Sequence, residues 1–168
     1  LTMANTILKL VGKERSVLTM GLTGYVTGIP VFCDSGFVIL SSLNRSMARR
    51  SGARMATMAI ALSTGLYATH TLVPPTPGPI AAAGNLGADL GLVILWGIVV
   101  SIPAMLAGYL YAVTAGNRLE IEMPEGDDWN ALLQRHLRLP SPGQAFAPLI
   151  LPLILIALSS AVNYPAVL

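Results

Sequence analysis

Four apolar stretches, separated by short polar segments, set the pattern of this sequence. They cover residues 17–43, 55–73, 80–115 and 147–168. Within the first, the only Asp, Glu, Lys or Arg is Asp34, and between residues 55 and 117 the only one is Asp89. A spanning helix needs about 20 mostly apolar residues, whereas a helix of a soluble protein keeps one polar face. The pattern therefore predicts an all-α integral membrane protein with several membrane passes.

The first apolar stretch, residues 17–43, contains the sequence Gly28-Ile29-Pro30 near its middle. Proline lacks an N–H and clashes with the preceding helical turn, so a helix is expected to break there. Two structures fit: a re-entrant pair of half-helices of about 13 residues each, or one long, kinked spanning helix. Arginine-rich loops stay on the cytoplasmic side. The basic residues in 1–16 and the four arginines in 44–54 therefore favour the re-entrant pair.

A second break is predicted in residues 55–91, where four prolines and a glycine lie between residues 74 and 79. We expect a helix from Met55 to Leu72, an extended segment, and a half-helix from Ile80 to about Leu86. The alternative is an ordinary loop between two helices. Residues 92–115 are predicted to span the membrane, 116–146 to form a polar loop, and 147–168 to begin a further transmembrane helix.

Composition agrees with a membrane protein, since 54% of residues are hydrophobic and 11% are charged. Soluble domains carry about a quarter charged residues. The chain begins at Leu1 and ends within an apolar stretch, so residues 1–168 are interpreted as one transmembrane region of a longer protein. The basic residues lie in short segments beside membrane helices, which favours a lipid bilayer and not nucleic acid as the partner. Self-association into a homo-oligomer stays open.

Asp34 and His70 are the candidate proton-coupling groups, because each is an ionisable side chain within an apolar stretch. Interrupted membrane helices bind substrates and ions in secondary transporters. A half-helix beginning at Ile80 would direct free N–H groups of Ala81 and Ala82 at a bound anion. The predicted substrate-binding residues are therefore grouped around the two breaks: Ser35, Gly36, Thr69, His70, Pro75, Thr76, Gly78 and Ala81. No nucleophile–base pair or metal-ligand cluster is recognisable, so we expect no enzyme activity, no metal and no cofactor besides the coupling ion, H⁺.

Several stretches resemble the gluconate permease family, the gluconate:proton symporters. They are Phe32-Cys33-Asp34-Ser35-Gly36-Phe37-Val38, Ala88-Asp89-Leu90-Gly91, Met123-Pro124-Glu125-Gly126 and, most specifically, Thr69-His70-Thr71-Leu72-Val73-Pro74-Pro75-Thr76-Pro77-Gly78-Pro79. The resemblance covers residues 10–126. Members often have Glu at the place of Asp34, and some have a second histidine at the place of Thr76.

The resemblance implies a fragment of the N-terminal half of a bacterial inner (plasma) membrane transporter with broken helices. It implies uptake of gluconate or a related small sugar acid by proton symport. Transport of another small carboxylate such as D-serine, or a role as a channel or structural membrane subunit, remains the alternative.

Overall fold

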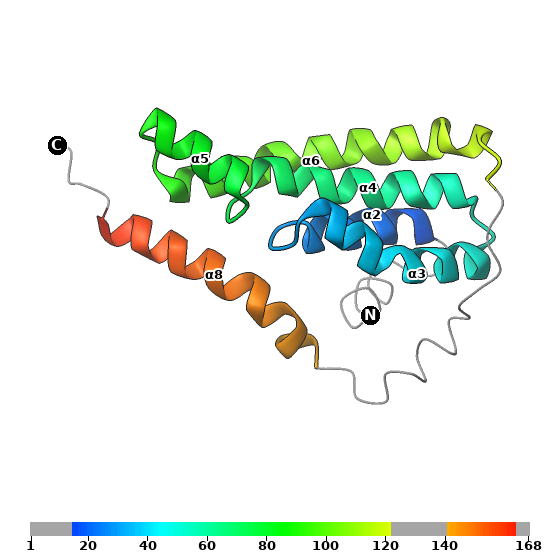
Figure 1. Cartoon of the computed structure of the whole chain (residues 1–168), viewed down its shortest axis with the longest axis horizontal. Helices are drawn as coiled ribbons and strands as arrows, with labels where there is room; N and C mark the ends of the chain where they lie inside the picture. Colours follow the sequence, from blue (N-terminus) through cyan, green and yellow to red (C-terminus); the bar gives the residue numbers. More distant parts are fainter. Residues whose placement is uncertain (1–14, 122–140, 164–168) are drawn as a thin grey trace.

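A computed structural model describes residues 15–121 and 141–163 of the chain (Figure 1). These residues form helices and contain no strand, which confirms the all-helical prediction for the described part. The predicted polar loop 116–146 and the end of the last apolar stretch lie partly outside it. The helices are α2 (Ser16–Thr27), α3 (Cys33–Ser51), α4 (Met55–Leu72), α5 (Pro77–Leu86), α6 (Leu90–Thr114), the 3₁₀ turn η2 (Gly116–Arg118) and α8 (Pro142–Asn163).

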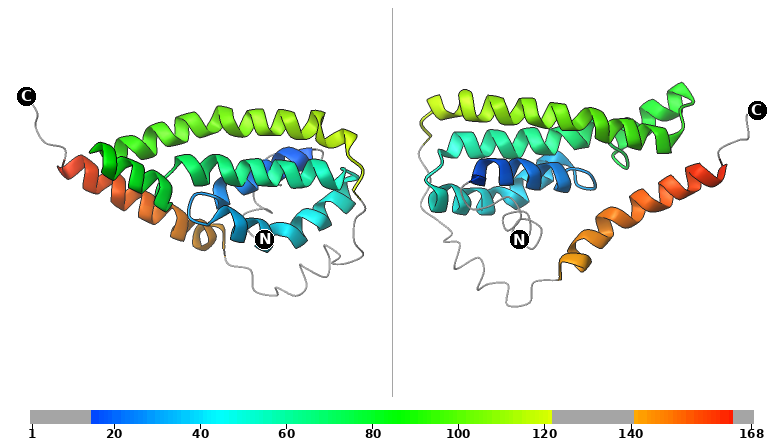
Figure 2. Two further views of the ribbon diagram at one scale, coloured as in Figure 1. Left: turned by 45° about the horizontal axis from the view of Figure 1, so that its top comes forward. Right: turned by 180° about the vertical axis from the view of Figure 1, so that it is seen from behind.

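The first apolar stretch forms two helices, α2 and α3, that run in opposite directions (Figure 2). The helix is interrupted between Gly28 and Phe32, where proline stands at position 30. The N–H of Gly28 donates to the carbonyl of Gly24 at 2.7 Å and closes the last turn of α2. The chain thus reverses at this tip and does not continue as one kinked helix. That the tip enters a bilayer stays a prediction.

Helix α3 is longer than the sequence predicted, because it continues to Ser51 through the arginine-rich segment 44–54. Leu43, Met47 and Ala48 are buried in the core of this region, together with residues of α2 and α4. Their spacing of three to four residues keeps one face of α3 on that core. The helix ends at Gly52, whose φ of 68° is a left-handed conformation that glycine adopts without strain.

The second break separates α4 from α5, but α5 begins at Pro77 and not at Ile80 as predicted. Pro77, Gly78 and Pro79 form the first turn of this helix. Proline is tolerated there because the first N–H groups of a helix have no partner within it. The non-helical segment is therefore only residues 73–76, and the Pro74–Pro75 peptide bond within it is cis.

Helix α6 begins at Leu90, where Asp89 accepts a 2.9 Å hydrogen bond from the N–H of Leu92 and caps it. Among the described residues, the stretch Leu90–Arg118 is the one helical segment long and apolar enough to cross a membrane by length and composition, with a mean hydropathy of 2.4. Helix α8 starts at Pro142, earlier than the predicted residue 147, and contacts α6.

Helix α4 lies between α2 and α6 and is in close contact with both through glycines. A Cβ atom at Gly65 would collide with the backbone oxygen of Gly21 on α2, and one at Gly108 with Thr64. Small residues let helix backbones approach closely and fix their relative position. Helix α2 runs parallel to α4, because Gly21 lies near Gly65 whereas Gly28 lies near Thr69.

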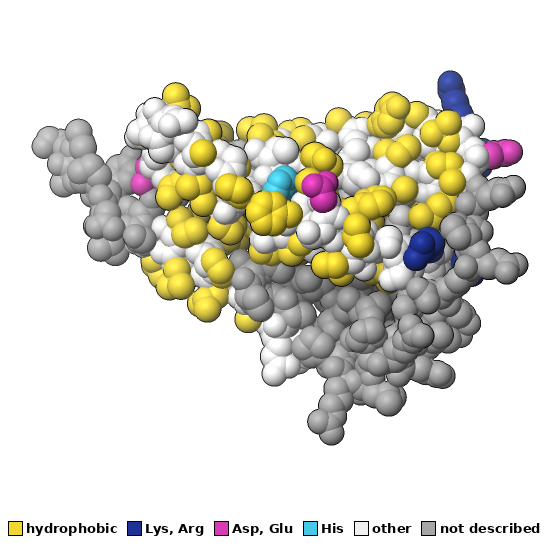
Figure 3. Space-filling model, in the orientation of Figure 1, with side chains coloured by type: hydrophobic (Ala, Val, Ile, Leu, Met, Phe, Trp, Pro, Cys, Tyr) yellow, Lys and Arg dark blue, Asp and Glu magenta, His cyan; other side chains and the backbone are white. Residues whose placement is uncertain are grey.

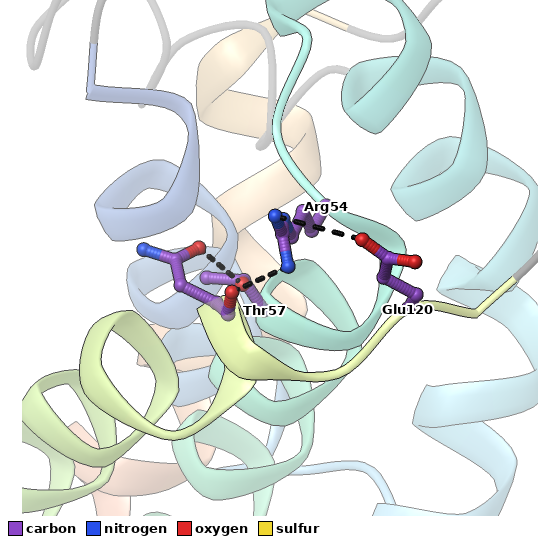
Figure 4. Close-up of polar contacts among 4 residues, drawn as sticks. Arg54, Thr57 and Glu120 are labelled. Carbon is purple, nitrogen blue, oxygen red and sulfur yellow. Dashed lines mark hydrogen bonds and ion pairs between the residues drawn. The ribbon is translucent and has the colours of Figure 1, made fainter.

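One end of this bundle carries all arginines that the structure describes. It is formed by the start of α2, the end of α3, the start of α4 and the end of α6, and it is the right-hand end in Figures 1 and 3. Figure 4 shows polar contacts at this end. The Arg54 guanidinium donates to the backbone oxygen of Asn117 at 2.6 Å, and it lies 3.9 Å from a carboxylate oxygen of Glu120. The Thr57 hydroxyl donates to the side-chain oxygen of Asn117. At the other end, the charged side chain among the described residues is Asp89.

Candidate functional site

The two helix interruptions, about 40 residues apart in the sequence, meet in the structure. The Phe32 ring at the α2–α3 tip lies 5.6 Å from the His70 ring, centroid to centroid. The Thr69 hydroxyl donates to the backbone oxygen of Tyr25 at 2.8 Å. A Cβ atom on Gly28 would lie 2.6 Å from the Thr69 hydroxyl oxygen, so the tip closely approaches the last turns of α4. The tip and the end of α4 therefore form one site.

This site lies near the middle of α6. The hydroxyl groups of Tyr25 and Ser101 are 2.8 Å apart, and Ser101 is fully buried. At 1.5 Å per residue, Ser101 is about 20 Å from the arginine end of α6 and about 16 Å from its start. The backbone oxygen of Leu72, at the second break, lies against Gly97. If α6 spans the membrane, both breaks are therefore at the depth where transporters bind their substrates.

Asp34 lies in the first turn of α3 and borders a pocket of about 250 Å³ between α3 and α4. Its carboxylate accepts a weak 3.7 Å hydrogen bond from the Cys33 thiol. The side chain is exposed within the described residues, although it lies in an apolar stretch of the sequence. Cys33, Phe37, Val38, Ser63, Leu66 and Tyr67 form the rest of the lining. Figure 3 shows one histidine beside one acidic side chain near the middle of this face, among mainly hydrophobic side chains, with the basic side chains toward the right-hand end.

Thr69 and Thr76 stabilise the backbone around His70. The Thr76 hydroxyl has donor contacts to the carbonyls of His70 (2.7 Å) and Val73 (2.9 Å), and the residue is buried. Thr69 is likewise buried and bonded to the tip. Both were predicted to bind substrate, but in this structure their hydroxyl protons are engaged with backbone carbonyls. Thr76 thereby connects the second break to the end of α4, and Thr69 connects α4 to α2.

Ser35 and Gly36, the other predicted residues beside Asp34, differ in their surroundings. Ser35 is exposed, whereas Gly36 is buried against α4. A Cβ atom at Gly36 would lie 2.8 Å from the Leu66 side chain. Gly36 therefore serves helix contact and leaves no room for a ligand at its α-carbon.

The N-terminus of α5 offers fewer donors than the sequence suggested. Pro77 and Pro79 have no N–H, and the N–H of Ile80 bonds the Thr76 carbonyl at 3.4 Å. Because α5 begins at Pro77, the N–H groups of Ala81 and Ala82 face carbonyls of its own first turn. The prediction that these two N–H groups are free is wrong, and the Gly78 N–H is the donor that remains within the Pro77–Pro79 turn.

Two further residues of the site, Tyr25 and Ser101, are not distinguished by the sequence pattern. Each is a polar residue in an apolar stretch, and their hydroxyl groups meet across 76 residues of chain. Among the described residues, no group of three or more His, Cys, Asp or Glu side chains is placed to hold a metal ion.

The fold and site define a class: an all-helical protein with one segment long and apolar enough to span a membrane, near whose middle two interrupted helices meet. Comparison with known proteins gives the family. Residues 2–166 match the model of the GntP family permeases, and the chain belongs to this family. The resemblance drawn from the motifs is thereby confirmed.

Curated relatives carry matching names. A gluconate permease of Pseudomonas aeruginosa is 38% identical over 94% of this chain and 35% of its own length. A low-affinity gluconate transporter of Escherichia coli K12 is 33% identical over 92% of this chain and 34% of its own length. The D-serine transporter DsdX of the same organism is 34% identical over 81% of this chain and 31% of its own length. The chain thus spans about a third of these relatives. No solved structure gives a significant match.

Proposed function

We propose that this chain is part of a secondary active transporter that takes up gluconate or a related small sugar acid together with a proton. The observation that carries the proposal is the meeting of two helix interruptions beside Asp34 and His70. They meet near the middle of α6, the one described helical segment that is long and apolar enough to cross a membrane. Irregular backbone at membrane depth is tolerated only where protein or a water-filled cavity covers it. A titratable pair at such a place suits proton coupling.

Two of the three relatives described above are named for gluconate and one for D-serine. Both compounds carry a carboxylate and at least one hydroxyl group. The described site can serve such a molecule through His70, the Gly78 N–H and the carbonyls of residues 73–76. This supports a small hydroxylated carboxylate as the substrate, with gluconate as the compound to test first.

We further propose a multi-pass protein of the bacterial inner membrane with the arginine end in the cytoplasm. Because α2 begins and α3 ends at that same end, residues 16–51 would enter the membrane and return. The positive-inside rule supports this orientation, since every described arginine lies at or within two turns of that end.

Uptake by proteoliposomes that contain the full-length protein tests the transport proposal. Labelled gluconate is added outside with an imposed pH gradient, alkaline inside, and then with a sodium gradient instead. We expect accumulation above the outside concentration with the pH gradient, and loss of that accumulation with a protonophore. Gluconate that only equilibrates would contradict proton symport, and dependence on the sodium gradient would assign the coupling to another ion. Competition by unlabelled D-serine distinguishes the two substrate classes.

A further inference from the structure

Thr27, the last residue of α2, differs from the other threonines that the structure describes. Threonines in helices commonly donate their hydroxyl to a carbonyl three or four residues earlier. Each of the other described threonines has a hydrogen-bond partner: Thr19, Thr23, Thr57, Thr64, Thr69, Thr71, Thr76 and Thr114. The Thr27 hydroxyl oxygen is buried and has none within the described part of the chain.

His70 provides the second such atom, because its Nδ1 is also buried without a partner among the described residues. The two residues belong to different helices but flank the same contact. Thr27 precedes Gly28 at the tip, Gly28 lies against Thr69, and Thr69 precedes His70. In the described part of the chain, the remaining buried polar atoms without partners belong to Asn44 and Ser46, which lie more than two turns along α3 from the tip.

A buried polar atom without a partner destabilises the folded state, and native proteins contain few of them. Here the two residues that carry such atoms each adjoin the Gly28–Thr69 contact in the chain, so a molecule bound between the tip and the end of α4 could pair with both atoms and remove the penalty. The Thr27 hydroxyl can both donate and accept, and the neutral imidazole of His70 offers either a donor or an acceptor at Nδ1. Hydroxyl groups, which also do both, match this pair.

We infer that Thr27 is a substrate-binding residue, whose hydroxyl pairs with a hydroxyl or carboxylate oxygen of the transported acid next to His70. The inference rests on the proposed function and adds to it a polar contact from the α2–α3 tip. It also gives the tip a direct part in recognising the substrate, beyond its contact with α4. Nothing in the sequence pattern distinguishes Thr27 from the other threonines of α2.

The test compares Thr27→Val, which keeps the shape but removes the hydroxyl, with Thr27→Ser, which keeps the hydroxyl. Thr23→Val is the matched control, because Thr23 is buried one turn earlier on α2 and bonded to its own helix at Thr19. Each variant is made in the full-length protein. Initial rates of gluconate uptake give KM and maximal rate at equal amounts of inserted protein, and thermal unfolding in detergent without substrate gives the melting temperature.

We expect Thr27→Val to raise the KM for gluconate about three- to tenfold, the range of one lost hydrogen bond. Its melting temperature without substrate should not fall, since no protein hydrogen bond is lost. Thr27→Ser and Thr23→Val should keep KM within about twofold of the wild type.

An unchanged KM in Thr27→Val, with normal uptake by the wild type, would overturn this inference alone and leave the proposed function intact. A raised KM that Thr27→Ser fails to restore would also overturn it, because shape and not the hydroxyl would then be responsible. If the wild-type protein takes up no gluconate, the proposed function fails and this inference with it.

Discussion

Replacing Gly28 by alanine tests the contact between the tip and α4. A Cβ atom at this position would lie 2.5 Å from the Leu66 backbone oxygen and 2.6 Å from the Thr69 hydroxyl, whereas ordinary contacts begin near 3.4 Å. The tip would have to retreat by about 1 Å, since the Leu66 oxygen belongs to the backbone of a packed helix. Overpacking of this kind costs about 1–3 kcal/mol.

The backbone itself does not oppose the change, because Gly28 has helical dihedral angles (φ −68°, ψ −13°) that alanine adopts readily. Any destabilisation must therefore come from the contact with α4. Gly84 on α5 is the matched control, because a Cβ atom there meets nothing within 4 Å and the position is exposed. Alanine favours a helix interior over glycine by about 0.5–1 kcal/mol, so Gly84→Ala should stabilise the protein.

The assay is thermal unfolding of the full-length protein in detergent, with the KM for gluconate measured alongside. We expect Gly28→Ala to lower the melting temperature and raise KM, because the retreat separates Thr27 and Phe32 from His70. Gly84→Ala should move the melting temperature in the opposite direction and leave KM unchanged. If Gly28→Ala stabilises the protein as Gly84→Ala does, the tip does not contact α4 in the way described.

Three further predictions concern coupling, orientation and the second break. Asp34→Asn should abolish pH-driven accumulation of gluconate while the protein stays inserted, and undiminished accumulation would remove Asp34 from the mechanism. With the arginine end in the cytoplasm, a cysteine that replaces the exposed Ser51 should resist an impermeant thiol reagent added to intact cells. A cysteine that replaces Leu86, which is 82% exposed at the other end, should react. The reverse labelling pattern would show that the proposed orientation is wrong. Gly78→Val should raise the KM for gluconate about tenfold more than Gly84→Val, because both positions have free space but only Gly78 adjoins the break; equal effects would place the substrate elsewhere.

The positions of both interruptions could be read from the sequence, because proline and glycine act locally on the backbone. The exact bounds could not. The run of arginines before Gly52 suggested a loop, yet α3 continues through it since its apolar side chains are buried. Prolines 77 and 79 suggested extended chain, yet they occupy the one turn of a helix that tolerates them.

The candidate site was predictable only in part. His70 was selected because an ionisable group in an apolar stretch is conspicuous, and the structure places it where the breaks meet. The sequence did not indicate Thr27, Tyr25 or Ser101, since threonine, tyrosine and serine are common in membrane helices. These residues stand out only once the helices are placed next to one another. The exposure of the Asp34 side chain could not be predicted from the sequence either, because its burial depends on which helices pack against α3.

The distribution of charge supports the proposed coupling of the substrate to a proton. The described arginines lie toward one end, about 20 Å from the site along α6. The first turn of α5 contains Pro77 and Pro79, which have no N–H, so a carboxylate there would meet few backbone donors among the described residues. An uncompensated charge at membrane depth is costly.

A proton taken up by His70 or Asp34 reduces the net negative charge of the loaded site by one, and this makes binding of the anion and of the proton mutually favourable. Thermodynamic linkage then requires that each raises the affinity for the other. Gluconate affinity should accordingly rise as the pH falls, and Asp34→Asn, which removes a negative charge permanently, should weaken that dependence even where it abolishes accumulation.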